Sequence, residues 1–76
     1  MQSIHISTVR RMLRAPEPVC LKCWKKDGGI MELHDAIPLR YNFYEGTQQF
    51  KILASREIRT IRINLIFEIN GCEVFL

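Results

Sequence analysis

The end of the chain combines the clearest strand pattern with the clearest turn. Two runs rich in β-branched and aromatic residues, 64–69 and 72–76, are separated by Asn70 and Gly71. Asn-Gly suits the positive φ angles of a two-residue type I′ turn, so the pattern predicts a β-hairpin in which Glu68 faces Glu73. Alternation then places one apolar strand face in the core: Leu65, Phe67, Ile69, Cys72, Val74 and Leu76.

The middle of the chain also alternates with a period of two. Val19, Leu21 and Cys23 share one predicted strand face, and turn-forming residues separate the apolar runs. Pro38 stands at the start of a run, where its missing N–H donor does least harm. The pattern predicts strands over 19–24, 31–37, 39–44 and 48–53, joined by turns at 26–29 and 45–47.

The alternation breaks before the terminal hairpin. Ile58 and Ile61 are three residues apart, which predicts a single helical or 3₁₀ turn around 55–59 that points both side chains inward. From Ile61 the alternation resumes and leads into the hairpin.

Residues 7–14 have the pattern of a short amphipathic helix. Val9, Met12 and Leu13 fall at helical spacing, Ser7 is suited to cap the first turn, and the prolines at 16 and 18 end the segment. A strand running through Ile4 and past Val9 is the competing interpretation.

These elements predict a single, mainly β domain over residues 1–76, with a helix over 7–14 and a sheet over 19–76. About six short strands separated by regular turns are typical of a small antiparallel SH3-like barrel or a strongly bent sheet. The connections are too short for parallel crossovers.

Composition limits the class of protein and the cellular compartment that we expect. An apolar content of 47% supports a small core, and a net charge of +3 is only mildly basic. Three cysteines are an odd number, which argues against a secreted disulfide framework. Without a leader pattern or an apolar run of membrane-spanning length, we expect a cytoplasmic protein with no membrane partner.

Cys20 and Cys23 have the spacing of a metal or redox motif. Zinc sites hold such a pair on a tight turn and add two further ligands. Here the pair lies in an alternating run, which points the two thiols to opposite faces, and Cys72, His5 and His34 are not paired at ligand spacing. We therefore expect no metal and no cofactor, and a core position for Cys23 and Cys72.

Glu68 and Glu73 face each other in the predicted hairpin, where like charges are destabilising. One interpretation is a carboxylate pair that shares a proton or a cation. The preferred interpretation is a structural ion pair with a nearby cation, for example from the Arg59 and Arg62 region. Because no nucleophile or base accompanies the pair, we expect no enzymatic activity.

Two groups of arginines suggest a nucleic-acid partner. Guanidinium groups at Arg10, Arg11 and Arg14 would contact phosphate, and exposed aromatic side chains would stack on bases. Glutamates dilute the basic groups, so this remains the alternative function. The second arginine group is 56, 59 and 62, and the aromatic candidates are Trp24, Tyr41 and Tyr44.

The preferred function is protein binding or assembly, including self-association as a homodimer. The non-core face of the terminal hairpin would carry Ile66 beside Phe75, and Trp24 lies on the outer face of the strand over 19–24. A 76-residue domain has difficulty burying both faces of two strands. Either the helix covers the second face or another chain does, and Trp24, Ile66 and Phe75 are the predicted contact residues.

Overall fold

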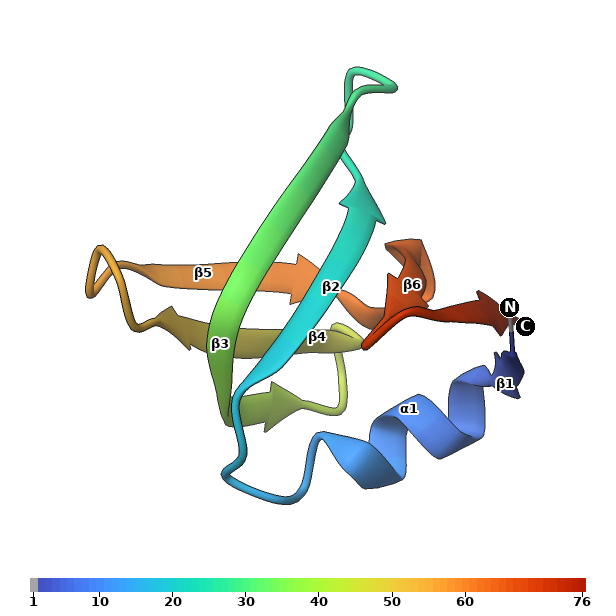
Figure 1. The fold of residues 1–76 in the computed structure, drawn as a ribbon, viewed down its shortest axis with the longest axis horizontal. Coiled ribbons are helices and arrows are strands. Elements are labelled where there is room, and N and C mark those ends of the chain that lie inside the picture. Colours follow the sequence, from blue (N-terminus) through green and yellow to red (C-terminus); the bar gives the residue numbers. More distant parts are fainter. Residues whose placement is uncertain (1) are drawn as a thin grey trace.

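The computed structural model describes residues 2–76 as one seven-stranded sheet with a short helix packed against it (Figure 1). The strands follow one another across the sheet in the order β1-β7-β6-β2-β3-β4-β5. The elements are β1 (Ser3–His5), α1 (Ile6–Met12), β2 (Val19–Trp24), β3 (Ile30–Asn42), β4 (Thr47–Ile52), β5 (Ile58–Arg62), the 3₁₀ turn η1 (Ile63–Leu65), β6 (Ile66–Ile69) and β7 (Cys72–Phe75).

The fold is mainly β, as predicted, but the sheet does not close into a barrel. β1 and β5 are its two edges, and the strand count is seven rather than six. β5 leads through η1 into β6, and β6 pairs with β2 and β7. Because both sides of β6 are occupied, β5 keeps β4 as its one strand partner, and the SH3-like closure is not formed.

The strands predicted over 31–37 and 39–44 are one bent strand, β3, of 13 residues. Asp35 has a positive φ of 51°, and the pairing of β3 shifts register opposite both β2 and β4. Such irregularities increase bend and twist without ending a strand. Pro38 therefore lies inside β3 rather than at the start of a strand, beyond the last pair with β2, which joins Val19 to Ala36.

The start of the chain forms the predicted helix, preceded by a three-residue strand, and the competing strand through Val9 is not formed. Ile4 lies in β1, and α1 begins at Ile6. The side chain of His5, rather than Ser7, caps the helix by accepting the Ser7 N–H at 3.1 Å. β1 runs parallel to β7, which brings the two ends of the chain side by side in Figure 1. The two strands of this parallel pair are the first and the last of the chain. The whole domain between them serves as the connection, so the short loops do not prevent the pairing.

The core lies between α1 and the curved inner face of the sheet. Ile6, Val9 and Leu13 of the helical segment are buried there together with Cys23 and Phe50, which are fully buried. The helix therefore covers part of the sheet, as one of the two sequence interpretations required. The other core residues are Val19, Leu21, Leu33, Ala36, Ile61, Ile63, Ile66 and Ile69.

The terminal hairpin has the predicted turn, and Ile69 and the alternation of β7 have the predicted faces, but the first half of β6 does not. Asn70 and Gly71 have φ angles of 48° and 79°, and Glu68 pairs with Glu73. However, Ile66 is buried and Phe67 only half-buried. Between the pairs Lys22–Glu68 and Cys23–Ile66, β6 contains one extra residue, so its alternation reverses phase at that bulge.

The helical turn expected around 55–59 lies instead at η1. Ile58 and Ile61 are both in the extended strand β5, where a spacing of three puts their side chains on opposite faces. Accordingly, Ile61 is 4% exposed and Ile58 is 61% exposed. The expectation that both point inward is wrong.

Candidate binding site

A groove lies between the end of α1 and the second half of β3, with a volume of about 590 Å³. This size is in the range of sites that hold a small ligand or a few side chains of a partner. We call it the helix groove. Its lining residues are Arg10, Leu13, Arg14, Pro16, Pro38, Leu39, Tyr41, Phe43, Gln48 and Ile63.

One wall of the helix groove is apolar and aromatic. Leu39, Tyr41 and Phe43 follow one another at intervals of two and remain 48%, 40% and 79% exposed. They lie past the point where β2 stops pairing with β3, so no neighbouring strand covers them on that side. The side-chain oxygen of Asn42 accepts the backbone N–H of Tyr44 at 3.1 Å, which fixes the turn that follows.

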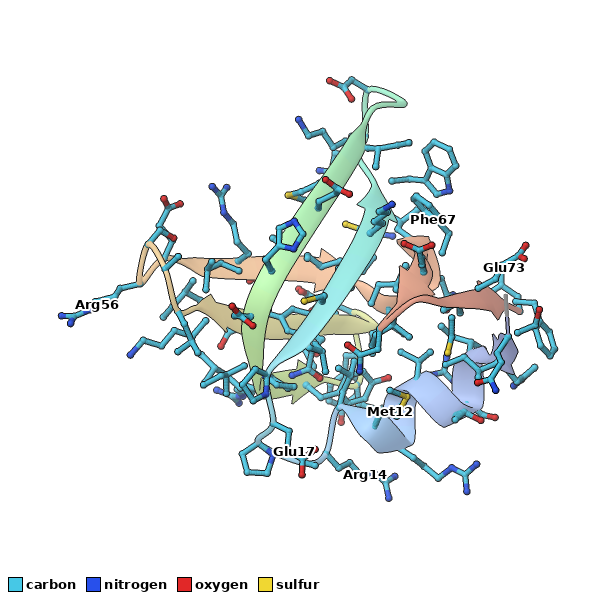
Figure 2. The ribbon with its side chains drawn as sticks, viewed as in Figure 1. Met12, Arg14, Glu17, Arg56, Phe67 and Glu73 are labelled. Carbon is cyan, nitrogen blue, oxygen red and sulfur yellow. The ribbon has the colours of Figure 1, made fainter. Side chains whose placement is uncertain are left out.

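The opposite wall is basic. Arg10 and Arg14 are four residues apart at the end of α1, which places both side chains on one side of the helical segment. Neither is in an ion pair within residues 2–76, and no carboxylate lines the groove. Arg11 points elsewhere and donates to the hydroxyl of Thr8 at 3.5 Å. Figure 2 shows Arg14 extending from the end of α1.

Gln48 supplies a polar group to the lining of the helix groove. Its side chain is 2% exposed, and its amide nitrogen donates to the Gln49 carbonyl at 3.1 Å. No other hydrogen bond holds this side chain, yet residues 2–76 contain no side-chain polar atom that is both buried and unpaired. The amide oxygen therefore keeps a small accessible area, in a residue that lines the groove.

The sequence had indicated Arg10, Arg14 and Tyr41 separately, and the fold brings them together. It had not indicated Leu39, Phe43 or the buried Gln48. Their contribution depends on the bend in β3, which brings its second half opposite the helix more than twenty residues earlier in the chain. The alternation of apolar and polar residues over 39–43 was the available signal.

The three residues predicted to contact a protein partner lie in different environments. Trp24 is 45% exposed and stacks on Phe67, with ring centroids 4.8 Å apart. Phe75 is 50% exposed and meets His5 edge-on at 5.3 Å. Ile66 is 2% exposed and belongs to the core, because the bulge in β6 turns it inward. The placement of Ile66 on the outer face is therefore wrong.

The two cysteines of the C-x-x-C pair point to opposite faces of β2, as predicted. Cys20 is exposed and Cys23 is buried, and burial raises the pKa of the Cys23 thiol. A raised pKa disfavours the thiolate that metal binding and thiol exchange require. Residues 2–76 contain no group of three side chains placed to hold a metal ion.

The carboxylates of Glu68 and Glu32 are compensated by Lys22 rather than by Arg59 or Arg62. The Lys22 ammonium lies 3.3 Å from Glu68 and 3.4 Å from Glu32. Hydrogen bonding to Glu68, then to Glu32, raises the pKa of Lys22. Arg59 pairs with Glu57 at 2.8 Å instead.

A scan against protein-family models gives no match, and searches of curated proteins and of solved structures find no similar chain. No helix within residues 2–76 has both the length and the apolar character needed to cross a bilayer. The proposed function therefore rests on the fold and the helix groove.

Proposed function

We propose that this protein is a small non-enzymatic binding module whose helix groove holds a segment of a partner protein. The observation that carries the proposal is the pairing of two walls: Arg10 and Arg14 face the exposed side chains of Leu39, Tyr41 and Phe43. The matching partner segment carries at least one carboxylate next to an aromatic or aliphatic side chain.

The chemistry of the lining favours a peptide. Arginine and aromatic side chains are the residues that contribute most to protein interfaces. A guanidinium group binds a carboxylate through two parallel hydrogen bonds, which gives direction as well as attraction. Gln48 lines the groove, and its amide oxygen is of the type that accepts a backbone N–H of a peptide.

Selection from a phage-displayed random peptide library tests this proposal. We expect the immobilised protein to select peptides that contain Asp or Glu beside an apolar residue. The double variant Arg10→Glu/Arg14→Glu should bind the selected peptides at least about tenfold more weakly, which corresponds to about 1.4 kcal/mol. Arg11→Glu is the control, because it makes the same kind of substitution on the same helix outside the groove, with half the charge change of the double variant.

Two other outcomes would replace the proposal. If no peptide is selected but a fluorescent oligothymidine binds, and binding weakens steeply with salt, the groove holds single-stranded nucleic acid through phosphate contacts and stacking on Tyr41. If light scattering shows a dimer that Arg10→Glu/Arg14→Glu dissociates, the groove is a self-association surface.

A further inference from the structure

The outer edge of β5 is a second candidate binding surface. The chain on both sides of this strand shows which backbone groups face β4. Ile52 donates its N–H to the Glu57 carbonyl at 2.8 Å, and Ile63 donates to the Gly46 carbonyl at 3.0 Å. In an antiparallel ladder, bonded and non-bonded pairs alternate. The pairing register between these two bonds is continuous. Counting from either end of the ladder therefore identifies the same alternate residues of β5 as hydrogen-bonded to β4.

By this alternation, the backbone N–H and C=O groups of Arg59 and Ile61 form the hydrogen bonds with β4. The N–H and C=O groups of Ile58, Thr60 and Arg62 then point away from β4. β5 ends the sheet, so these groups face an edge with no neighbouring strand. Among them, the Arg62 C=O is already used, because Arg62 is the N-cap of η1 and its carbonyl accepts the first hydrogen bond of that turn. An unpaired strand edge of this kind is a template for another extended segment.

A second groove runs along the same edge, between β5 and the ends of β2 and β3 that meet at residues 24–31. We call it the edge groove. Its apolar surface comes from Trp24, Met31 and Leu65, with Ile61 and Cys23 beneath. Trp24 is held in place by Phe67, so the largest apolar side chain of the lining is preorganised.

The rest of the lining is cationic. Lys25, Lys26, Arg59 and Arg62 line the edge groove together with Thr60, and no carboxylate lines it. Arg59 is bound to Glu57, but both side chains are more than half exposed. An exposed pair of this kind is weak and is readily exchanged for another carboxylate.

We propose that the edge groove binds an extended acidic peptide segment, which adds to β5 as an eighth strand. The N–H and C=O groups of Thr60 and the N–H of Arg62 supply the main-chain hydrogen bonds, and the groove supplies specificity through its apolar and cationic side chains. The stretch of β5 that lines the groove, 59–62, accommodates a segment about 13 Å long. This site is separate from the helix groove and goes beyond the function proposed for it.

Charge argues against a second copy of the protein at this edge. Pairing two β5 strands would bring two sets of four cations together without a carboxylate in the lining. Nucleic acid fits less well than a peptide, because phosphate accepts hydrogen bonds and cannot donate to the outward carbonyl group of Thr60.

A capped hexapeptide that alternates glutamate and valine, followed by NMR, tests the proposal. We expect titration to shift the backbone amides of Thr60 and Arg62 and the indole of Trp24, and to slow hydrogen exchange at those two amides. The amides of Arg59 and Ile61 should be protected before the peptide is added, because they already bond to β4. The same peptide with lysine in place of glutamate should not bind.

Backbone methylation of the peptide separates strand addition from simple charge attraction. Two versions of the peptide are compared, N-methylated on all valines or on all glutamates. Because only alternate amides of an added strand face β5, one version should bind like the parent and the other about tenfold more weakly, as expected for two or so lost hydrogen bonds. Equal binding of both versions would overturn the proposal.

Variants of the protein provide the complementary test. Arg59→Glu/Arg62→Glu should reduce peptide affinity by about tenfold or more. Arg56→Glu is the control, since Figure 2 places Arg56 at the outer tip of the turn between β4 and β5, and it does not line the groove. Thr60→Pro removes an outward N–H, which a strand edge tolerates, and should weaken binding in a folded protein.

Three results contradict strand addition. The first is the absence of shifts at Thr60 and Arg62 at millimolar peptide. The second is a set of shifts confined to the helix groove. The third is equal binding of an oligothymidine with the same amides affected. If Thr60→Pro does not fold, the methylated peptides still decide the question, because they leave the protein unchanged.

Discussion

At the scale of single residues, Lys22 offsets the repulsion between carboxylates on the surface of the sheet. Glu68 and Glu73 are direct cross-strand neighbours, an arrangement that destabilises a hairpin. Lys22 offsets this by holding Glu68 and Glu32 at 3.3 and 3.4 Å. The sequence pattern correctly paired the glutamates and indicated a neighbouring cation, but its example, the Arg59 and Arg62 region, is not the source, because the pattern does not show that β2 lies beside β6.

Replacing Lys22 by methionine should lower the thermal midpoint at neutral pH. The pKa of Lys22 is raised in the folded state, so its stabilising effect is fully present below the ordinary lysine range and is lost as the pH rises through the raised value. The difference between wild type and Lys22→Met should therefore close in strongly alkaline buffer, and shrink in high salt. Thermal melts at several pH values measure it.

Lys51→Met is the control for this experiment, because Lys51 is an exposed lysine of a central strand with no ion pair within residues 2–76. A Lys22→Met defect that stays the same at every pH would show that lost packing, rather than charge, causes it.

At the scale of elements, the terminal hairpin is fixed both by its turn and by a contact to β2. Asn70 and Gly71 adopt the positive φ angles that their dipeptide predicts. The side-chain oxygen of Asn70 also accepts the Cys20 N–H at 3.0 Å, and the Asn70 N–H donates to the Cys20 carbonyl at 2.7 Å. The turn residue therefore ties the hairpin to the neighbouring strand.

Asn70→Gly should destabilise the protein by about 1 kcal/mol, although glycine suits the turn. The variant keeps the backbone hydrogen bond to Cys20 and loses the one made by the side chain. Asn70→Asp retains the acceptor and a tolerance for positive φ, so it should stay close to wild type. Urea unfolding of the three proteins measures the differences. Equal stability of wild type and Asn70→Gly would mean that the side-chain bond contributes nothing.

At the scale of the whole molecule, the two ends of the chain stabilise each other. β7 lies between β1 and β6, and Ile4 of β1 is opposite Val74 of β7. β1 continues directly into α1, whose Ile6 and Val9 are in the core. The C-terminal strand thus holds the helix on the sheet through a parallel pair that spans nearly the whole chain.

Deletion of residues 74–76 should unfold the protein. It removes the β7 partners of Ile4 and His5, and with them most of the pairing that holds β1 and the helix to the sheet, and a small domain has only about 5–15 kcal/mol of stability to lose. Deletion of Leu76 alone is the control and should be nearly neutral, because that residue is 74% exposed. Circular dichroism and one-dimensional NMR distinguish the two. A three-residue deletion that melts like wild type would mean that β1 and α1 hold to the sheet without β7.

The sequence by itself determined the local features: the Asn70-Gly71 turn, the alternation of β2, the opposed faces of Cys20 and Cys23, and a helix ending before Pro16. Each depends on the intrinsic preferences of a few adjacent residues. Tertiary structure decided the phase of β6, because the pairing with β2 requires a bulge that buries Ile66 and leaves Phe67 half-buried against Trp24. It also decided the open sheet and both grooves. Those features depend on which distant strands become neighbours, and alternation along one strand carries no information about its partner.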